Sequence, residues 1–252
     1  MQYGAQLYTV REFTQTEAGF DETIGKIAKI GYKWVQVSGA GPIPPERIRR
    51  ICDGYGVRIA VTHTAPERIR TDTARVIEDH RILGADYIGI GALPGGYPRT
   101  RGGVESFARD FSAAVSEISR AGMHFVYHNH DFEFEKSEGK TLMEHFADML
   151  GERSGFIPDV FWIQAGGGDP AHWIERLAGR ADAVHFKDMV MVGGERRMCE
   201  IMEGNLNWER IYAACEKAGV KWAFVEQDDC YGVDPFECLR VSLENMERYK
   251  KY

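Results

Sequence analysis

Two histidines and three carboxylates lie close together within residues 128–135 of the chain. Residues 123–135 read MHFVYHNHDFEFE, so that an apolar run leads into His128 and His130, with Glu133 shortly after them. A strand that turns polar at its end is typical of a site at the mouth of a barrel or the edge of a sheet. Ionisable groups packed this closely repel one another unless a cation or hydrogen bonds offset the charge. Taken alone, this segment is explained equally well by a functional site and by an ordinary polar strand end with carboxylates on the surface.

The same pattern recurs in other apolar segments. Asp159 lies in GFIPDVFWI, His185 lies in AVHFK, Glu226 ends VKWAFVE, and His63 follows VRIAVT. A carboxylate in an apolar strand must be paired or must bind a metal ion. A satisfied core histidine or a salt bridge would explain each residue singly, but together they favour a metal site. Carboxylates and imidazoles without thiolates suit Mn²⁺, Mg²⁺, Co²⁺ or Zn²⁺.

Strand-like and helical patterns alternate along the chain, which predicts parallel strands joined by helical crossovers. The expected strands are residues 2–10, 32–37, 57–62, 86–90, 123–135, 155–163, 183–187 and 220–226. Eight such units in 252 residues predict an α/β protein with a closed (β/α)₈ TIM barrel. A doubly wound open sheet is the alternative. It would need a glycine-rich phosphate turn, which the runs at Gly39 and Gly89 match only weakly. Since no linker interrupts the chain, we expect one domain over residues 1–252.

The composition argues against nucleic-acid and membrane partners. Lys and Arg number 31 against 38 Asp and Glu, a formal charge of −7, which suits phosphate backbones poorly. No apolar run approaches the roughly 20 residues that span a bilayer. The five cysteines form no C-x-x-C pair, and the first residues lack the pattern of a signal peptide. We therefore expect reduced thiols and a cytoplasmic protein.

Five segments follow one another along the chain: YHNHDFEF, DVFWIQAGGGDP, RADAVHFKD, MEGNLNW and FVEQD. Together and in this order they resemble the sugar phosphate isomerase/epimerase family of xylose isomerase-like TIM barrels. The resemblance implies one divalent metal ion held by Glu, Asp, His and Glu from strands five to eight. The last three positions fall on Asp159, His185 and Glu226. The first falls on Glu133, with His130 as the alternative because HNH-type members depart from the plain fifth-strand glutamate.

The implied activity is isomerisation or epimerisation of a keto sugar or sugar derivative. A metal ion that bridges the carbonyl and a neighbouring hydroxyl stabilises the enediolate formed by proton removal. The resemblance assigns Glu133 and Glu226 to remove and return that proton. Substrate contacts are expected from six further residues: His63, His128, His130, Trp162, Gln164 and Lys187. For Lys187, a solvated lysine at a strand end is nearly as good an explanation.

Three other functions remain open from the sequence. The same enediolate could expel a leaving group, which would make the protein a metal-dependent lyase or dehydratase of a keto-inositol or 3-keto-glycoside. A phosphodiesterase like the AP endonucleases would need a cluster of metal ions and a basic surface. A metal-free sugar-binding barrel would keep its sugar affinity after chelation. In each sugar hypothesis the partner is a small molecule, and a homo-oligomer is expected from the resemblance alone.

Overall fold

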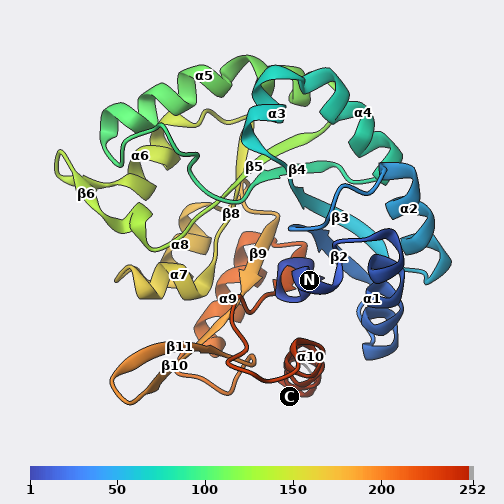
Figure 1. Cartoon of the computed structure of the whole chain (residues 1–252). Coiled ribbons are helices and arrows are strands. Elements are labelled where there is room, and N and C mark those ends of the chain that lie inside the picture. The colour runs from blue at the N-terminus through green and yellow to red at the C-terminus, as the bar shows by residue number, and fades with distance from the viewer. Residues whose placement is uncertain (250–252) are drawn as a thin grey trace.

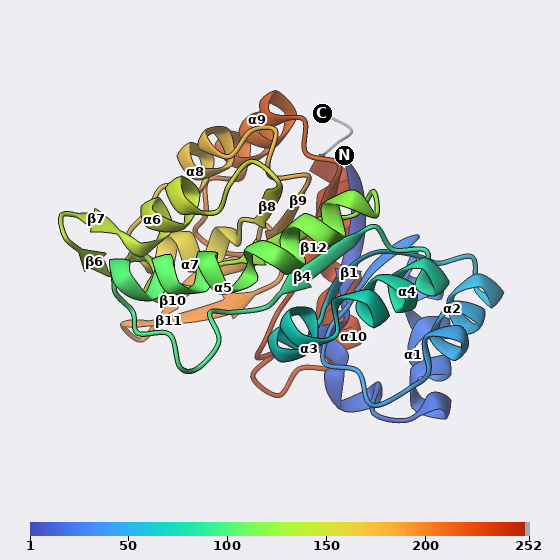
Figure 2. The same ribbon diagram turned by 90° about the horizontal axis from the view of Figure 1, so that it is seen from above.

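Eight parallel strands surrounded by helices form the centre of the structure (Figures 1 and 2). The computed structural model describes residues 1–249. The strands are β1 (Gln2–Gln6), β2 (Trp34–Val37), β3 (Arg58–His63), β4 (Tyr87–Ile90), β5 (His124–His128), β8 (Ser154–Ile157), β9 (Ala183–Phe186) and β12 (Trp222–Val225). Their order in the sheet is β8-β5-β4-β3-β2-β1-β12-β9.

The two outer strands of this sheet approach each other just beyond β8. A parallel bridge joins Asp159 to His185, and the backbone N–H of His185 donates to the carbonyl of Pro158 over 2.9 Å. The sheet is therefore a nearly closed barrel, and the predicted (β/α)₈ fold is confirmed. All eight strands run the same way, so their carboxyl ends meet at one end of the barrel.

Helices cover the outside of the barrel between successive strands (Figure 2). They are α1 (Glu17–Ile30), α2 (Pro45–Gly54), α3 (Pro66–Thr71), α4 (Thr73–Leu83), α5 (Arg101–Arg120), α6 (Leu142–Met149), α7 (Val160–Ala165), α8 (Pro170–Arg176), α9 (Trp208–Ala218) and α10 (Pro235–Tyr249). Local signals set several of these ends. Thr16 caps α1 by accepting from the N–H of Gly19, and Gly84 ends α4 with a φ of 68°. None of the helices within residues 1–249 is long and apolar enough to cross a bilayer.

Three predicted strands are shorter than expected because helical turns replace their carboxyl halves, and two of them carry candidate site residues. The strand expected at 155–163 ends at Ile157, and α7 begins at Val160. The Asp159 side chain accepts from the N–H of Trp162 and caps this helix, so the apolar residues after it pack as a helix. The strand expected at 123–135 ends at His128, and a short 3₁₀ helix, η2 (Phe132–Phe134), follows.

Smaller hairpins extend two of the loops. The strands β6 (Lys136–Ser137) and β7 (Lys140–Thr141) form one hairpin, and β10 (Asp188–Val192) and β11 (Glu195–Cys199) form the other. A 3₁₀ helix, η1 (Leu7–Phe13), replaces the end of the first expected strand. The β10–β11 hairpin lies at the rim of the barrel, directly after β9 (Figure 1).

The interior of the barrel is packed so closely that Gly4 has no room for a side chain. A Cβ atom at this position would lie 2.5 Å from Cε1 and 2.6 Å from Cδ1 of Phe224. We expect Gly4→Ala to lower the free energy of unfolding by about 1–3 kcal/mol, because β1 and the Phe224 ring must move apart. Urea denaturation would measure the change. The control is Gly54→Ala at the end of α2, where nothing lies within 4 Å of the new Cβ; equal effects of the two substitutions would contradict the packing argument.

Candidate metal centre

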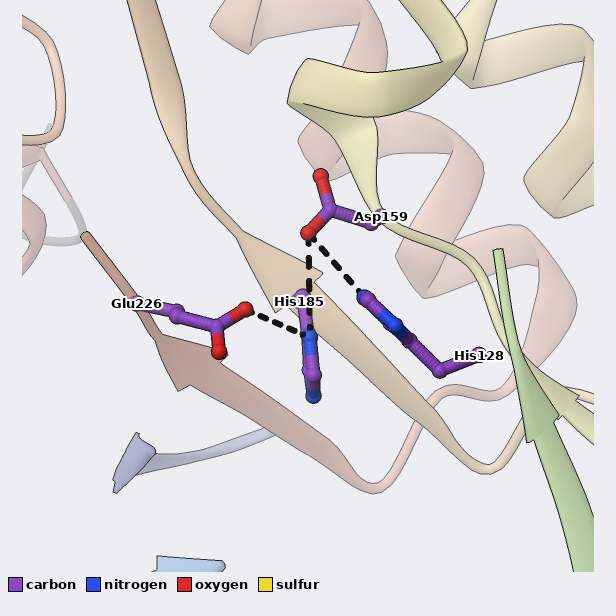
Figure 3. A group of neighbouring side chains, drawn as sticks. All are labelled: His128, Asp159, His185 and Glu226. Carbon is purple, nitrogen blue, oxygen red and sulfur yellow. Dashed lines mark hydrogen bonds and ion pairs between the residues drawn. The ribbon is translucent and has the colours of Figure 1, made fainter. Parts of the chain in front are cut away.

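Four buried side chains converge at the carboxyl end of the barrel (Figure 3). His128 ends β5, Asp159 follows β8, His185 lies in β9 and Glu226 follows β12. One ligand atom from each residue can be chosen so that all four lie within 4.8 Å of one another. Residues far apart in the sequence meet here because the parallel strands that carry them end at the same rim.

His185 lies between the two carboxylates of this group (Figure 3). Its Nδ1 is 3.0 Å from Glu226 Oε2 and 3.7 Å from Asp159 Oδ2, and His128 Nε2 is 3.3 Å from the same aspartate oxygen. Neither His185 Nδ1 nor Glu226 Oε2 makes a hydrogen bond of normal geometry. Two imidazole nitrogens and two carboxylate oxygens that point at one another fit a divalent cation of the first transition row or zinc.

Gln36, at the middle of β2, fixes the orientation of the His185 ring. His185 Nε2 lies 2.8 Å from Gln36 Oε1, and a carbonyl oxygen can only accept. The proton of the neutral ring is therefore on Nε2, which leaves the lone pair of Nδ1 directed at the carboxylates, as a metal ligand requires. Burial lowers the pKa of His185, but Glu226 and Asp159 outweigh that effect and raise it to about 8. Gln36 was not among the sequence-based candidates, although a glutamine in an apolar strand is a signal that could have found it.

Lys187 is buried beside the same carboxylates. Its Nζ lies 3.1 Å from Asp159 Oδ2, 2.8 Å from Glu226 Oε2 and 2.9 Å from Asp228 Oδ2. Burial would raise the pKa of Asp159 and Glu226, but the ammonium of Lys187 and the imidazoles of His128 and His185 together outweigh it and hold both values well below the ordinary range. Three carboxylates around one ammonium leave two formal negative charges, which one divalent cation would balance.

Glu133 does not join the four-residue group. Its Oε1 accepts from the hydroxyl of Tyr127 over 2.5 Å, and its Oε2 accepts from the backbone N–H of His130 over 2.8 Å. The 3₁₀ turn after β5 folds Glu133 back onto its own strand, so that both oxygens are engaged. The structure thus brings together three of the four predicted ligands, Asp159, His185 and Glu226. The fourth place is taken by His128, which the sequence predicted as a substrate contact.

A family model described as xylose isomerase-like TIM barrel matches residues 24–249. The chain belongs to this family. Among curated proteins, no sequence matches the chain. The family confirms the resemblance found in the sequence, and the donor group described above lies at the end of the barrel where enzymes with this fold carry their sites.

Solved structures share the fold over nearly the whole chain. A sugar phosphate isomerase/epimerase from Parabacteroides distasonis is 22% identical, with a TM-score of 0.82 over 98% of this chain and 93% of that one. An L-ribulose 3-epimerase is 13% identical, with a TM-score of 0.75 over 98% of this chain and 94% of that one. The IolI protein, solved with a zinc atom bound, is 12% identical, with a TM-score of 0.73 over 98% and 97%. At these identities the likeness shows the shared barrel.

Several residues that the sequence predicts to contact the substrate lie around the four-residue group. The ring centroids of His63 and His128 are 5.4 Å apart, and those of His130 and Trp162 are 5.3 Å apart. His63 Nε2, His130 Nδ1 and Trp162 Nε1 are buried and have no hydrogen-bond partner. Buried nitrogens without partners are costly, so these three are suited to bind oxygen atoms of a ligand. Gln164 differs, because it lies exposed on α7 instead of at a strand end.

Glu133 should make the stability of the protein depend on pH. Burial raises its pKa from an ordinary 4.5 to about 7, against the opposing effect of its hydrogen bonds from Tyr127 and His130. The unfolded chain loses this proton near pH 4.5 and the folded protein near pH 7, so the stabilising contribution is complete below the lower value and is lost between the two. Relative to Glu133→Gln, which cannot titrate, the wild type should lose up to about 3 kcal/mol of unfolding free energy over this range. Urea unfolding of both proteins from pH 4 to 8 measures the difference, and a difference that does not change with pH would contradict the prediction.

Proposed function

We propose that the protein is a divalent-metal-dependent isomerase or epimerase of a keto sugar or sugar derivative. The observation that carries this proposal is the buried group of His128, Asp159, His185 and Glu226 at the carboxyl end of the barrel. Membership of the xylose isomerase-like family supports it, as do neighbours that are themselves a sugar phosphate isomerase/epimerase and an L-ribulose 3-epimerase.

The four side chains of this group would hold the ion. When bound, a divalent ion polarises a keto carbonyl and stabilises the negative charge that follows removal of the adjacent proton. Two imidazole donors favour Zn²⁺, Co²⁺ or Mn²⁺ over Mg²⁺, which prefers oxygen ligands. The zinc in the IolI neighbour supports an ion of this kind.

Proton transfer is assigned first to Glu226. It belongs to the four-residue group and keeps 4% of its surface exposed, whereas Asp159 and Glu133 are fully buried. A carboxylate at this place can take a proton from the substrate carbon and return it. Glu133, the second carboxylate of the sequence-based scheme, would act here by fixing the backbone at His130 through its hydrogen bond to that N–H.

Neutral ring nitrogens would bind the substrate hydroxyls. Burial lowers the pKa of His63 well below its ordinary value and that of His130 to about 3, so both rings are uncharged at neutral pH. The unpartnered nitrogen of each uncharged ring, His63 Nε2 and His130 Nδ1, can donate to or accept from a hydroxyl group, depending on the tautomer. Together with the indole N–H of Trp162, they would select a polyhydroxylated substrate.

The AP endonuclease-like alternative is less well supported than the sugar hypotheses. Within residues 1–249, the four-residue group is the only cluster of three or more His, Cys, Asp or Glu side chains with ligand atoms this close together. A phosphodiesterase of that type needs several metal ions and a basic surface, whereas the formal charge of this chain is −7. We therefore propose a small-molecule substrate and no nucleic-acid partner.

The proposal is tested by proton exchange with solvent. The protein, reconstituted in turn with Mn²⁺, Co²⁺, Zn²⁺ and Mg²⁺, is incubated in D₂O with a panel of keto pentoses, keto hexoses, a keto-inositol and a 3-keto-glycoside. Mass spectrometry then reads deuterium uptake and the products. Ion-dependent uptake with an epimer or aldose as product is the expected result. Loss of water or of an aglycone instead would identify the lyase, and a panel without exchange despite a bound ion would contradict the proposed reaction.

A further inference from the structure

Lys187 shares its carboxylate oxygens with the imidazoles of the candidate metal centre. Its Nζ contacts Asp159 Oδ2 at 3.1 Å and Glu226 Oε2 at 2.8 Å, the same two atoms that face His185 Nδ1. The lysine side chain is 1% exposed, so water does not screen its charge. A divalent cation held by these oxygens would therefore have to share them with a positive charge that is already present.

Asp228 gives the ammonium a partner outside the four-residue group. Its Oδ2 lies 2.9 Å from Lys187 Nζ, and its side chain is 23% exposed, the most accessible of the three carboxylates. The ring of Trp162 lies 5.3 Å from the same nitrogen, within the range of a cation–π interaction. Lys187 can thus release Asp159 and Glu226 and still keep one carboxylate and one aromatic face.

We infer that Lys187 is a built-in cation that competes with the divalent ion for Asp159 and Glu226, and that Asp228 holds the ammonium when the ion is bound. The inference rests on the proposed function, since it requires an ion at this site. In the ion-free protein the ammonium compensates buried carboxylates that would otherwise repel each other. When the ion enters, part of its binding free energy is used to displace the ammonium, so the ion is held more weakly than the four ligands alone would hold it.

Binding of MnCl₂ measured by isothermal titration calorimetry at fixed pH tests the competition. We compare the wild type with Lys187→Met, Asp228→Asn and the double variant. Lys187→Met should bind Mn²⁺ at least about tenfold more tightly, a change of the size that neighbours of metal ligands typically cause. Asp228→Asn should bind it several-fold more weakly, because the displaced ammonium then has no carboxylate left. In the Lys187→Met background, Asp228→Asn should have little effect, since Asp228 acts through the lysine.

Lys221→Met is the matched control for the loss of a paired lysine. Lys221 precedes β12, at the opposite end of the strand from Glu226, and its Nζ is 3.0 Å from Asp182. Its replacement should leave Mn²⁺ affinity unchanged. Thermal unfolding of Lys187→Met with and without MnCl₂ adds a second readout: the variant should be less stable than the wild type without the ion and should gain more stability from it.

Three of the four possible results separate this inference from the proposed function. Equal or weaker Mn²⁺ binding by folded Lys187→Met would overturn the competition, while the wild-type metal site would stand. If that variant does not fold, unchanged or tighter binding by Asp228→Asn overturns it instead. Mn²⁺ binding by Lys187→Met but not by the wild type would support the competition and remove metal dependence from the function. Absence of binding in both would overturn both.

Discussion

Asp159→Asn is expected to lose the divalent ion and, with it, turnover of the substrate. The amide oxygen can still accept from the N–H of Trp162 at the start of α7, so the cap of the helix is kept. The amide NH₂, however, would face Lys187 Nζ, His128 Nε2 and His185 Nδ1, where Oδ2 now lies within 3.1–3.7 Å of each. One anionic ligand is thereby replaced by a neutral group that repels the remaining donors. We expect ion affinity to fall by more than about 100-fold, beyond the range seen when only neighbours of metal ligands are changed.

Asp169→Asn is the matched control for this substitution. Asp169 also caps a helix, α8, by accepting from the N–H groups of Ala171 and His172, but it pairs on the surface with Arg210. Asparagine is a comparable N-cap, so this variant should keep the ion and unfold within about 1 kcal/mol of the wild type. Elemental analysis and calorimetry of the two variants side by side provide the measurement. Equal ion content in both would show that Asp159 serves as a helix cap and not as a ligand.

Most of the barrel could be predicted from the sequence because each unit carries its own local signals. The apolar strands alternate with helices whose starts are marked by side-chain caps, such as Thr16 before α1 and Asp169 before α8. Parallel strands also share one carboxyl end, so polar residues at successive strand ends could be grouped before any distance was known. That rule brought Asp159, His185 and Glu226 together, although each of them is separated from the next by a whole helix or more.

The fourth member of the group depended on where β5 stops, and the sequence does not settle that point. His128 is the last residue of β5, and a 3₁₀ turn then carries Glu133 onto the hydroxyl of Tyr127. If the strand had continued to residue 135, as predicted, no turn would have brought the Glu133 side chain back onto Tyr127. The expected strand at 155–163 failed for a related reason, since the Asp159 side chain caps a helix instead of lying within a strand. A short apolar run fits the repeat of a buried helix as well as that of a buried strand, and tertiary contacts decide which of the two forms.

The environment of Lys187 could not be read from the sequence because its partners are distant in the chain. A lysine after a strand is usually solvated, yet here Asp159, Glu226 and Asp228 surround it. Only closure of the barrel brings the ends of β8, β9 and β12 close enough for one ammonium to contact all three. The hydrogen bond from His185 to Gln36 has the same origin, since the two residues are 149 positions apart.

Asp188→Asn is expected to cause the largest loss of stability among single changes near the site. Its buried carboxylate organises the loop that follows β11: Oδ2 accepts from the N–H groups of Met202 and Gly204 at 2.8 and 3.1 Å and from the indole of Trp208 at 2.6 Å, and Oδ1 accepts from Met189 N–H at 2.7 Å. The loop folds closely around it, since a Cβ at Gly204 would lie 2.5 Å from Oδ1.

An asparagine at position 188 cannot replace both oxygens. Its NH₂ group would point at two or three N–H donors, which leaves them buried without an acceptor at a cost of about 1–3 kcal/mol each before relaxation. We expect the free energy of unfolding to fall by roughly 3–5 kcal/mol, with faster hydrogen exchange at Met202 and Gly204. The control is Asp148→Asn, which removes an exposed ion pair with Lys140 and should cost less than about 1 kcal/mol. Urea unfolding of the two variants decides the matter: if Asp188→Asn behaves like Asp148→Asn, this carboxylate does not hold the loop. Because Asp188 directly follows Lys187, a loosened loop should also weaken the placement of the ammonium beside Asp228.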